Sequence, residues 1–178
     1  MRSIFLTVFS LVCFAGIAQI DAFQQNIIDY LKVNGTQMQY SKAYDDMFQV
    51  LQKNFETSNI PETVWTDLKN GKGKSMEEIT EFLSFAYRKH FTQAEIKTMT
   101  NFYKTEAAQK MLNPTTGALS EAENGEITAY FDSPVAQKVA SKLPELSEDI
   151  SEISNHWSRD LFKEKMEALL KLGYRPKQ

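Results

Sequence analysis

Cysteine and histidine are scarce in this sequence of 178 residues. The only cysteine, Cys13, lies in an apolar N-terminal run, and there are two histidines. Without that run the chain has no thiol, which excludes disulfides, cysteine nucleophiles and thiolate metal sites. The net charge is only −3, so the clustered basic excess of a protein that binds a phosphate backbone is missing. We therefore expect no nucleic-acid partner.

The N-terminal run has the features of a secretory signal peptide. Arg2 precedes an apolar segment over residues 4–17, and the small residues Gly16 and Ala18 fit a cleavage site. The segment is shorter than the ~20 residues that span a bilayer. We expect residues 1–18 to be removed, with cleavage after Ala22 as the alternative. The product would reside in the periplasm or outside the cell, with no stable membrane span.

Glycine and proline are few, with 7 and 5 residues, and they mark expected boundaries of helices. Pro61, Pro134 and Pro144 can each occupy the first turn of a helix, where no amide donor is lost. Between them the apolar residues recur in steps of three and four, which indicates one buried helical face, and no segment alternates as a strand would. The sequence therefore predicts an all-α fold, a compact multi-helix bundle with a long C-terminal helix over 144–172 that ends at Gly173.

Three capping boxes mark expected helix starts. They pair Ser75 with Glu78, Thr92 with Glu95 and Ser120 with Glu123. Further helices are expected over residues 21–32, 37–55 and 61–69, and a loop over 70–74. We divide the chain into N-terminal helices and a loop (19–74), a helical repeat region (75–173) and a tail (174–178).

An internal repeat occupies the middle of the chain. The segment that begins at Phe91 returns at Leu119, shifted by 28 positions, with Thr100 matched by Thr128. The segment 107–110, Ala-Ala-Gln-Lys, is matched by 135–138, Val-Ala-Gln-Lys. Two copies are too few for a solenoid. We expect them to pack against each other as a pseudo-symmetric helical pair.

Several of these motifs resemble a known family. The sequence is similar to the domain of unknown function 2059 family in the segments 87–95, 102–105 and 109–110. The similarity continues in the segment 142–146 and in a helix that contains Trp157. The resemblance spans roughly residues 75–173. It implies an exported helical bacterial protein, typically of a Gram-negative envelope, and it implies no activity or cofactor.

Candidate catalytic groups are few. His90 stands beside basic residues at an expected helix end, where the helix dipole favours a cation. No carboxylate is spaced to orient His90 or His156, and we interpret His156 as a surface residue. Four acids share one face of the long helix near its expected N-terminal end, where the helix dipole favours negative charge. A weak site for a cation or a basic partner is the alternative interpretation. These acids are Glu145, Glu148, Asp149 and Glu152. We expect no catalytic residue, no metal ligand and no cofactor.

The candidate interaction surface consists of Gln109, Lys110, Gln137 and Lys138, which the two copies of the repeat would bring together. The alternative is that Ala108 and Ala136 allow close helix packing and the polar residues point outward. We expect a non-catalytic envelope protein that binds another protein. A carrier or sensor of an apolar small ligand is the second hypothesis, and a hydrolase-type enzyme that uses His90 is the third.

Overall fold

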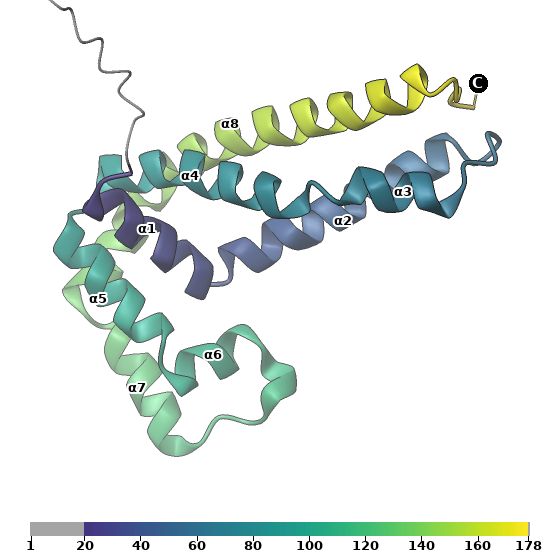
Figure 1. Cartoon of the computed structure of the whole chain (residues 1–178). Helices are drawn as coiled ribbons and strands as arrows, with labels where there is room; N and C mark the ends of the chain where they lie inside the picture. The colour runs from purple at the N-terminus through teal and green to yellow at the C-terminus, as the bar shows by residue number, and fades with distance from the viewer. Residues whose placement is uncertain (1–19, 178) are drawn as a thin grey trace, which may run out of the picture.

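The structure is a computed structural model that describes residues 20–177, and the expected signal peptide lies outside this range. Within it the fold is all-α, as predicted, with eight α-helices and one 3-10 turn (Figure 1). The elements are α1 (Ala22–Val33), α2 (Thr36–Asn54), α3 (Glu62–Lys69), α4 (Lys72–His90), α5 (Gln93–Tyr103), α6 (Glu106–Leu112), η1 (Pro114–Thr116), α7 (Glu121–Phe131) and α8 (Pro134–Lys171). None of these helices combines the length and the apolar character needed to cross a membrane.

One apolar core joins the helices. Ile27 of α1, Phe48 of α2, Leu83 of α4, Ile96 of α5 and Leu169 of α8 are all nearly inaccessible to solvent and belong to the same buried cluster. Helix α1 packs against α4 and α5, and α4 packs against α8. In Figure 1, α5, α6, α7 and the start of α8 extend away from the layer that α2, α4 and the rest of α8 form.

Local capping explains most helix starts. Asp21 caps α1 through the amide of Gln24, and the predicted capping boxes at Thr92 and Ser120 are both confirmed. The capping box predicted at Ser75 is wrong, because α4 begins at Lys72 and includes part of the expected loop over 70–74. The Ser75 hydroxyl accepts a hydrogen bond from a distant indole, which local sequence rules do not capture.

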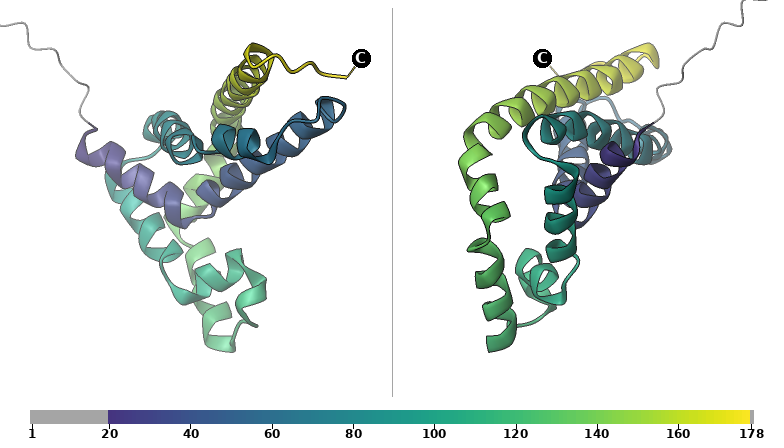
Figure 2. Two further views of the ribbon diagram at one scale, coloured as in Figure 1. Left: turned by 45° about the vertical axis from the view of Figure 1, so that its right-hand side comes forward. Right: turned by 90° about the vertical axis from the view of Figure 1, so that its left-hand side faces the viewer.

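The long C-terminal helix is confirmed, but its start at Pro144 is wrong. Helix α8 begins at Pro134, where Ser133 caps it, and it continues through Pro144 to Lys171. A proline inside a helix removes one hydrogen bond and favours a kink. Figure 2 shows α8 turning sharply, so that its two parts run in different directions. The predicted stop is confirmed, since Gly173 follows the helix with a φ of +94°.

The C-terminal tail is held against the turn between α2 and α3. The amide of Lys177 donates to the carbonyl of Asn54 at 2.7 Å, and its ammonium group pairs with Glu56 at 2.8 Å. The Ser58 hydroxyl and the Arg175 carbonyl are also hydrogen-bonded. These contacts tie the far end of α8 to the N-terminal helices.

Candidate functional site

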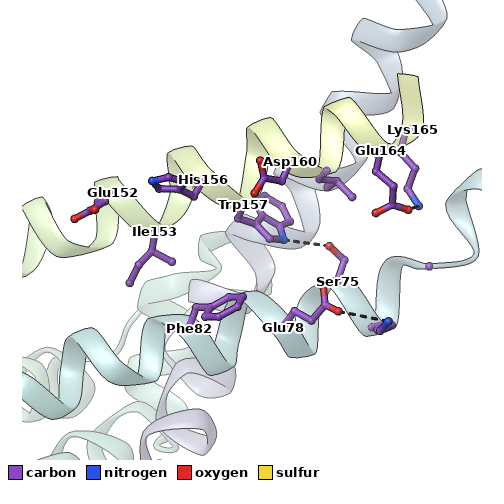
Figure 3. Close-up of a pocket in the computed structure, with 13 residues that line it drawn as sticks. Ser75, Glu78, Phe82, Glu152, Ile153, His156, Trp157, Asp160, Glu164 and Lys165 are labelled. Carbon is purple, nitrogen blue, oxygen red and sulfur yellow. Dashed lines mark hydrogen bonds and ion pairs between the residues drawn. The ribbon is translucent and has the colours of Figure 1, made fainter. Parts of the chain in front are cut away.

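A groove of about 530 Å³ runs between α4 and the second part of α8 (Figure 3). The two helices pass antiparallel here. At one end Gly71 faces Lys165, because a Cβ at Gly71 would lie 3.5 Å from the lysine Nζ. Phe82 and Glu152 lie toward the other end of the groove.

The floor of the groove is apolar and includes two aromatic residues. Ile153 and Trp157 are half-buried, Leu161 is buried, and the Phe82 side chain is 54% exposed. Phe85 lies one turn further along α4 and is 52% exposed. Exposed phenylalanines at this i, i+3 spacing share one helix face and therefore continue the apolar surface beyond the groove.

Trp157 is held in a defined orientation. Its Nε1 donates to the Ser75 hydroxyl at 3.1 Å, and its ring and that of Tyr40 form a T-shaped pair with centroids 5.4 Å apart. The Tyr40 hydroxyl is in turn hydrogen-bonded to Ser154. An indole fixed in this way loses little conformational freedom when a ligand binds over it.

Charged residues form the rim of the groove. Glu152, His156, Asp160 and Glu164 recur every four residues along α8, and Glu78 lies on α4. Two lysines also line the groove, and each contacts an acid of the rim: the exposed Lys74 is 3.6 Å from Glu78, and the buried Lys165 is 2.9 Å from Glu164. Four carboxylates and two ammonium groups therefore line the groove, which leaves it negatively charged.

His90 lies outside this groove and is enclosed by carboxylates. Its Nε2 is 2.7 Å from the Asp149 carboxylate, and its Nδ1 is 3.6 Å from Glu145. The expectation that no carboxylate orients His90 is therefore wrong. Lys89 also donates to Asp149 at 2.9 Å. The Lys89 ammonium and the His90 imidazole together hold the pKa of the Asp149 carboxyl below its usual value.

The helix-dipole interpretation of the acids on α8 is also wrong. Because α8 begins at Pro134, Glu145, Glu148, Asp149 and Glu152 lie beyond its first turn, outside the reach of the N-terminal dipole. Asp149 instead binds the basic C-terminal end of α4, and Glu145 pairs with Lys142 at 3.0 Å. His156 is exposed, as expected, and its Nδ1 contacts Arg159 at 2.7 Å.

The predicted interaction surface is involved in contacts within the chain. Lys110 pairs with Glu123 at 2.7 Å, and Lys138 pairs with Glu95 at 2.8 Å. Gln109 donates to the carbonyl of Val33 at 2.9 Å. Gln137 donates to the carbonyl of Asp132 at 3.1 Å. Ala108 and Ala136 are buried, which is what close helix packing requires.

Aromatic rings fill the space between α5 and α7. Phe102 and Tyr130 stack face to face, with centroids 3.6 Å apart and planes at 3°. On either side, Phe102 meets Phe131 with centroids 6.0 Å apart and Tyr103 meets Tyr130 at 6.1 Å, both edge to face. Phe102 is buried in this cluster, Phe131 at its edge is 49% exposed, and none of these residues lines the groove.

The groove was missed because its aromatic residues fit the core pattern of their helices. Phe82 precedes Leu83, and the two side chains point in different directions on α4, so that Leu83 is buried and Phe82 is exposed. Phe85 widens the apolar surface of α4 beyond one buried stripe. An apolar surface wider than one buried stripe was therefore the feature of the sequence that could have indicated the groove.

Comparison with known proteins connects part of the chain to a family. Residues 77–118 match the model of a family described as an uncharacterized protein conserved in bacteria (DUF2059). The match confirms the resemblance over this segment, which runs from α4 to just beyond η1 and is shorter than the expected 75–173. No curated protein and no solved structure matches the chain.

Proposed function

We propose that this protein is exported to the cell envelope and acts there as a non-catalytic helical module that binds another protein through the groove between α4 and α8. The observation that carries the proposal is the exposed ring of Phe82 beside Trp157 in an apolar groove with a charged rim. Aromatic residues enclosed by a polar rim are typical of the centre of protein interfaces. Large apolar side chains left exposed in this arrangement favour a partner that covers them.

A non-catalytic role is supported by the surroundings of the histidines. The His90 side chain is only 4% exposed, and both ring nitrogens face carboxylates. A general base must reach a proton on the substrate, and this ring is covered. His156 is accessible, but its Nδ1 contacts Arg159 at 2.7 Å, so this nitrogen is already engaged within the chain.

We also propose that the segments beginning at Phe91 and Leu119 are two copies of one repeat, related by a pseudo-twofold axis. A twofold relation makes contacts reciprocal, so that a contact from one copy to the other recurs with the roles exchanged. The pairs Lys110–Glu123 and Lys138–Glu95 exchange in this way under the shift of 28 positions. The stacked Phe102 and Tyr130 are equivalent positions and would lie on the axis.

Site-specific photocrosslinking in the native envelope tests the binding surface. A photoreactive phenylalanine analogue is placed at position 82 in the groove, at Gln137 on the sequence-derived surface, and at Val50, an exposed control on α2. We expect one reproducible protein adduct from position 82 alone. An adduct from position 137 and none from 82 would move the binding surface to Gln109, Lys110, Gln137 and Lys138. No adduct above background from either position would contradict the proposed function.

A carrier or sensor of an apolar small ligand is the second candidate function. The groove volume of about 530 Å³ favours it, because small-molecule pockets typically measure ~300–1,000 Å³ and often lie between helices. Native mass spectrometry of gently purified protein distinguishes the two. A co-purifying small mass that Phe82→Ser releases would support a carrier, whereas the bare polypeptide mass in several preparations would count against one.

A further inference from the structure

We propose that the partner segment in the groove is a basic amphipathic α-helix. This inference rests on the proposed function and specifies its partner. It follows from three properties of the groove: its length, the position of its apolar floor and the sign of its rim.

The length of the groove suits a helix. Its wall on α4 extends from Gly71 to Phe82 and its wall on α8 from Glu152 to Lys165. At 1.5 Å per residue these walls are about 16 and 20 Å long, which corresponds to three to four helical turns. Two helices side by side present an elongated apolar channel, which amphipathic helices fill with one face.

The floor offers contacts at helical spacing. Phe82 lies toward one end, and Trp157 and Leu161 follow toward the other, with the indole held in place by Ser75. A partner helix with apolar residues at i, i+4 and i+7 would present one side chain per turn along this floor. Phe85 continues the apolar surface beyond the groove and would contact a longer partner helix.

The rim determines the sign of the partner's charge. Glu152, Asp160 and Glu164 are exposed and lie in one row along α8, with His156 between the first two. Glu164 is already paired with Lys165, and the one ion pair of Asp160 within residues 20–177 is with its exposed neighbour Arg159, at 3.4 Å. Among the described residues Glu152 forms no ion pair. Glu152 and Asp160 are therefore available to lysine or arginine residues spaced two turns apart on a partner helix, and they would disfavour an acidic one.

Binding of designed peptides to the full mature chain tests this inference. Three labelled amphipathic peptides share one leucine face and carry lysine, glutamate or serine on the other face. Each is about 18 residues long, a length at which helices can form in water. Fluorescence anisotropy measures their affinities. We expect the lysine peptide to bind about tenfold or more tightly than the glutamate peptide, and its affinity to fall as salt is added.

Matched variants place the binding in the groove. Glu152→Lys combined with Asp160→Lys should weaken the lysine peptide about tenfold and strengthen the glutamate peptide. Glu126→Lys on α7 with Asp132→Lys at its C-cap makes the same change in net charge on an exposed surface away from the groove and should leave both affinities unchanged. Phe82→Ser should weaken all peptides, and circular dichroism confirms that each variant is folded.

Three results would overturn the inference. The first is equal binding of all three peptides, which indicates a purely apolar occupant. The second is lysine-peptide binding that the control charge variant weakens as much as the groove variant, which indicates general attraction to an acidic protein. The third is self-association lost in Phe82→Ser, which places a second copy of this chain in the groove. In each case an adduct of position 82 with a protein other than this chain would still support the proposed function, whereas its absence would remove that function as well.

Discussion

Glu123 connects two successive helices, α6 and α7, while it also caps α7. Its side chain binds Lys110 of α6 at 2.7 Å and accepts from the amide of Ser120 at 2.7 Å. The Lys110 ammonium, followed by Ser120, lowers the pKa of Glu123 to about 2 from its usual 4.5. Both contacts are stronger with the ionised carboxylate than with the neutral acid, so the residue couples protonation to folding.

Glu123→Gln should therefore alter the acid sensitivity of the protein. A carboxyl with a depressed pKa in the folded state stabilises fully above pH 4.5 and loses this contribution as pH falls towards about 2. We expect the variant to be less stable than the wild type at pH 7 and to lose less stability over this acidic window. Urea midpoints across pH 2 to 7 measure the effect, with Glu126→Gln as an exposed control. Parallel curves for wild type and Glu123→Gln would contradict the assignment.

Ser75 is the residue that orients Trp157. Ser75→Ala removes the acceptor of the indole Nε1 at the edge of the groove. A lost hydrogen bond of this kind costs about 0.5–1.5 kcal/mol, and the tryptophan emission should shift as the ring gains freedom. Chemical denaturation and fluorescence measure both effects. Ser158→Ala, on the exposed side of α8, should change neither. Unchanged emission in Ser75→Ala would mean that Tyr40 alone holds the ring.

At the scale of elements, small residues set how closely α6 approaches the body of the molecule. Ala108 has an exposed fraction of 0% and Ala107 of 1%, although α6 contains only seven residues. By contrast, no residue of α7 is buried, and this helix is held mainly by the aromatic cluster and by ion pairs. The two neighbouring helices should therefore respond differently to the same substitution.

Ala108→Leu should destabilise the protein by about 1–3 kcal/mol, because the added atoms have no space in a packed contact. Ala129→Leu, on the exposed surface of α7, should stay within about 0.5 kcal/mol of the wild type. Thermal and urea unfolding of both variants measure the difference. If Ala108→Leu were tolerated as well as Ala129→Leu, the close approach of α6 would be wrong.

The proposed repeat predicts that its two cross-copy ion pairs behave alike. A double-mutant cycle on Glu95 and Lys138 should give a favourable coupling below about 1 kcal/mol, since both side chains are partly exposed. The cycle on Glu123 and Lys110 should give a coupling of the same sign that falls similarly with salt. A favourable coupling at one pair and none at the other would argue against equivalent roles for the two pairs.

At the scale of the whole molecule, the start of α1 bears on the proposed export. Asp21 caps α1 through Gln24 and binds Arg88 of α4 at 2.7 Å, so it links the first helix to the core. The Gln24 amide and Arg88 hold the pKa of its carboxyl below the usual value, as expected for a carboxylate bound in the folded state. Cleavage after Ala18 retains this residue, whereas cleavage after Ala22 removes it.

We therefore expect the exported protein to begin at Gln19. N-terminal sequencing of protein purified from the periplasm or the medium measures this directly. A chain truncated to begin at Phe23 should unfold at a lower temperature than one that begins at Gln19, because it lacks the cap and the contact with Arg88. A native product that begins at Phe23 would contradict the prediction, and recovery of the intact N-terminus would contradict export by cleavage.

The sequence by itself determined which segments are helical and where most of them begin and end. Thr92 and Ser120 each close a capping box within three residues, and Gly173 follows a helix end that needs a positive φ. These signals are local, because hydrogen bonds in a helix join residues three or four positions apart. The repeat that we propose around Gln109 and Gln137 likewise rests on a comparison of residues along the sequence.

Only the tertiary structure decided what each helix faces. It placed Asp149 against His90, positioned Ser75 beneath Trp157, and carried α8 through Pro144. It also left Phe82 exposed while Leu83 is buried. Periodicity shows that a face is apolar but not which neighbour covers it, because that depends on contacts between residues distant in the chain. The groove consequently appears only when α4 and α8 are placed side by side.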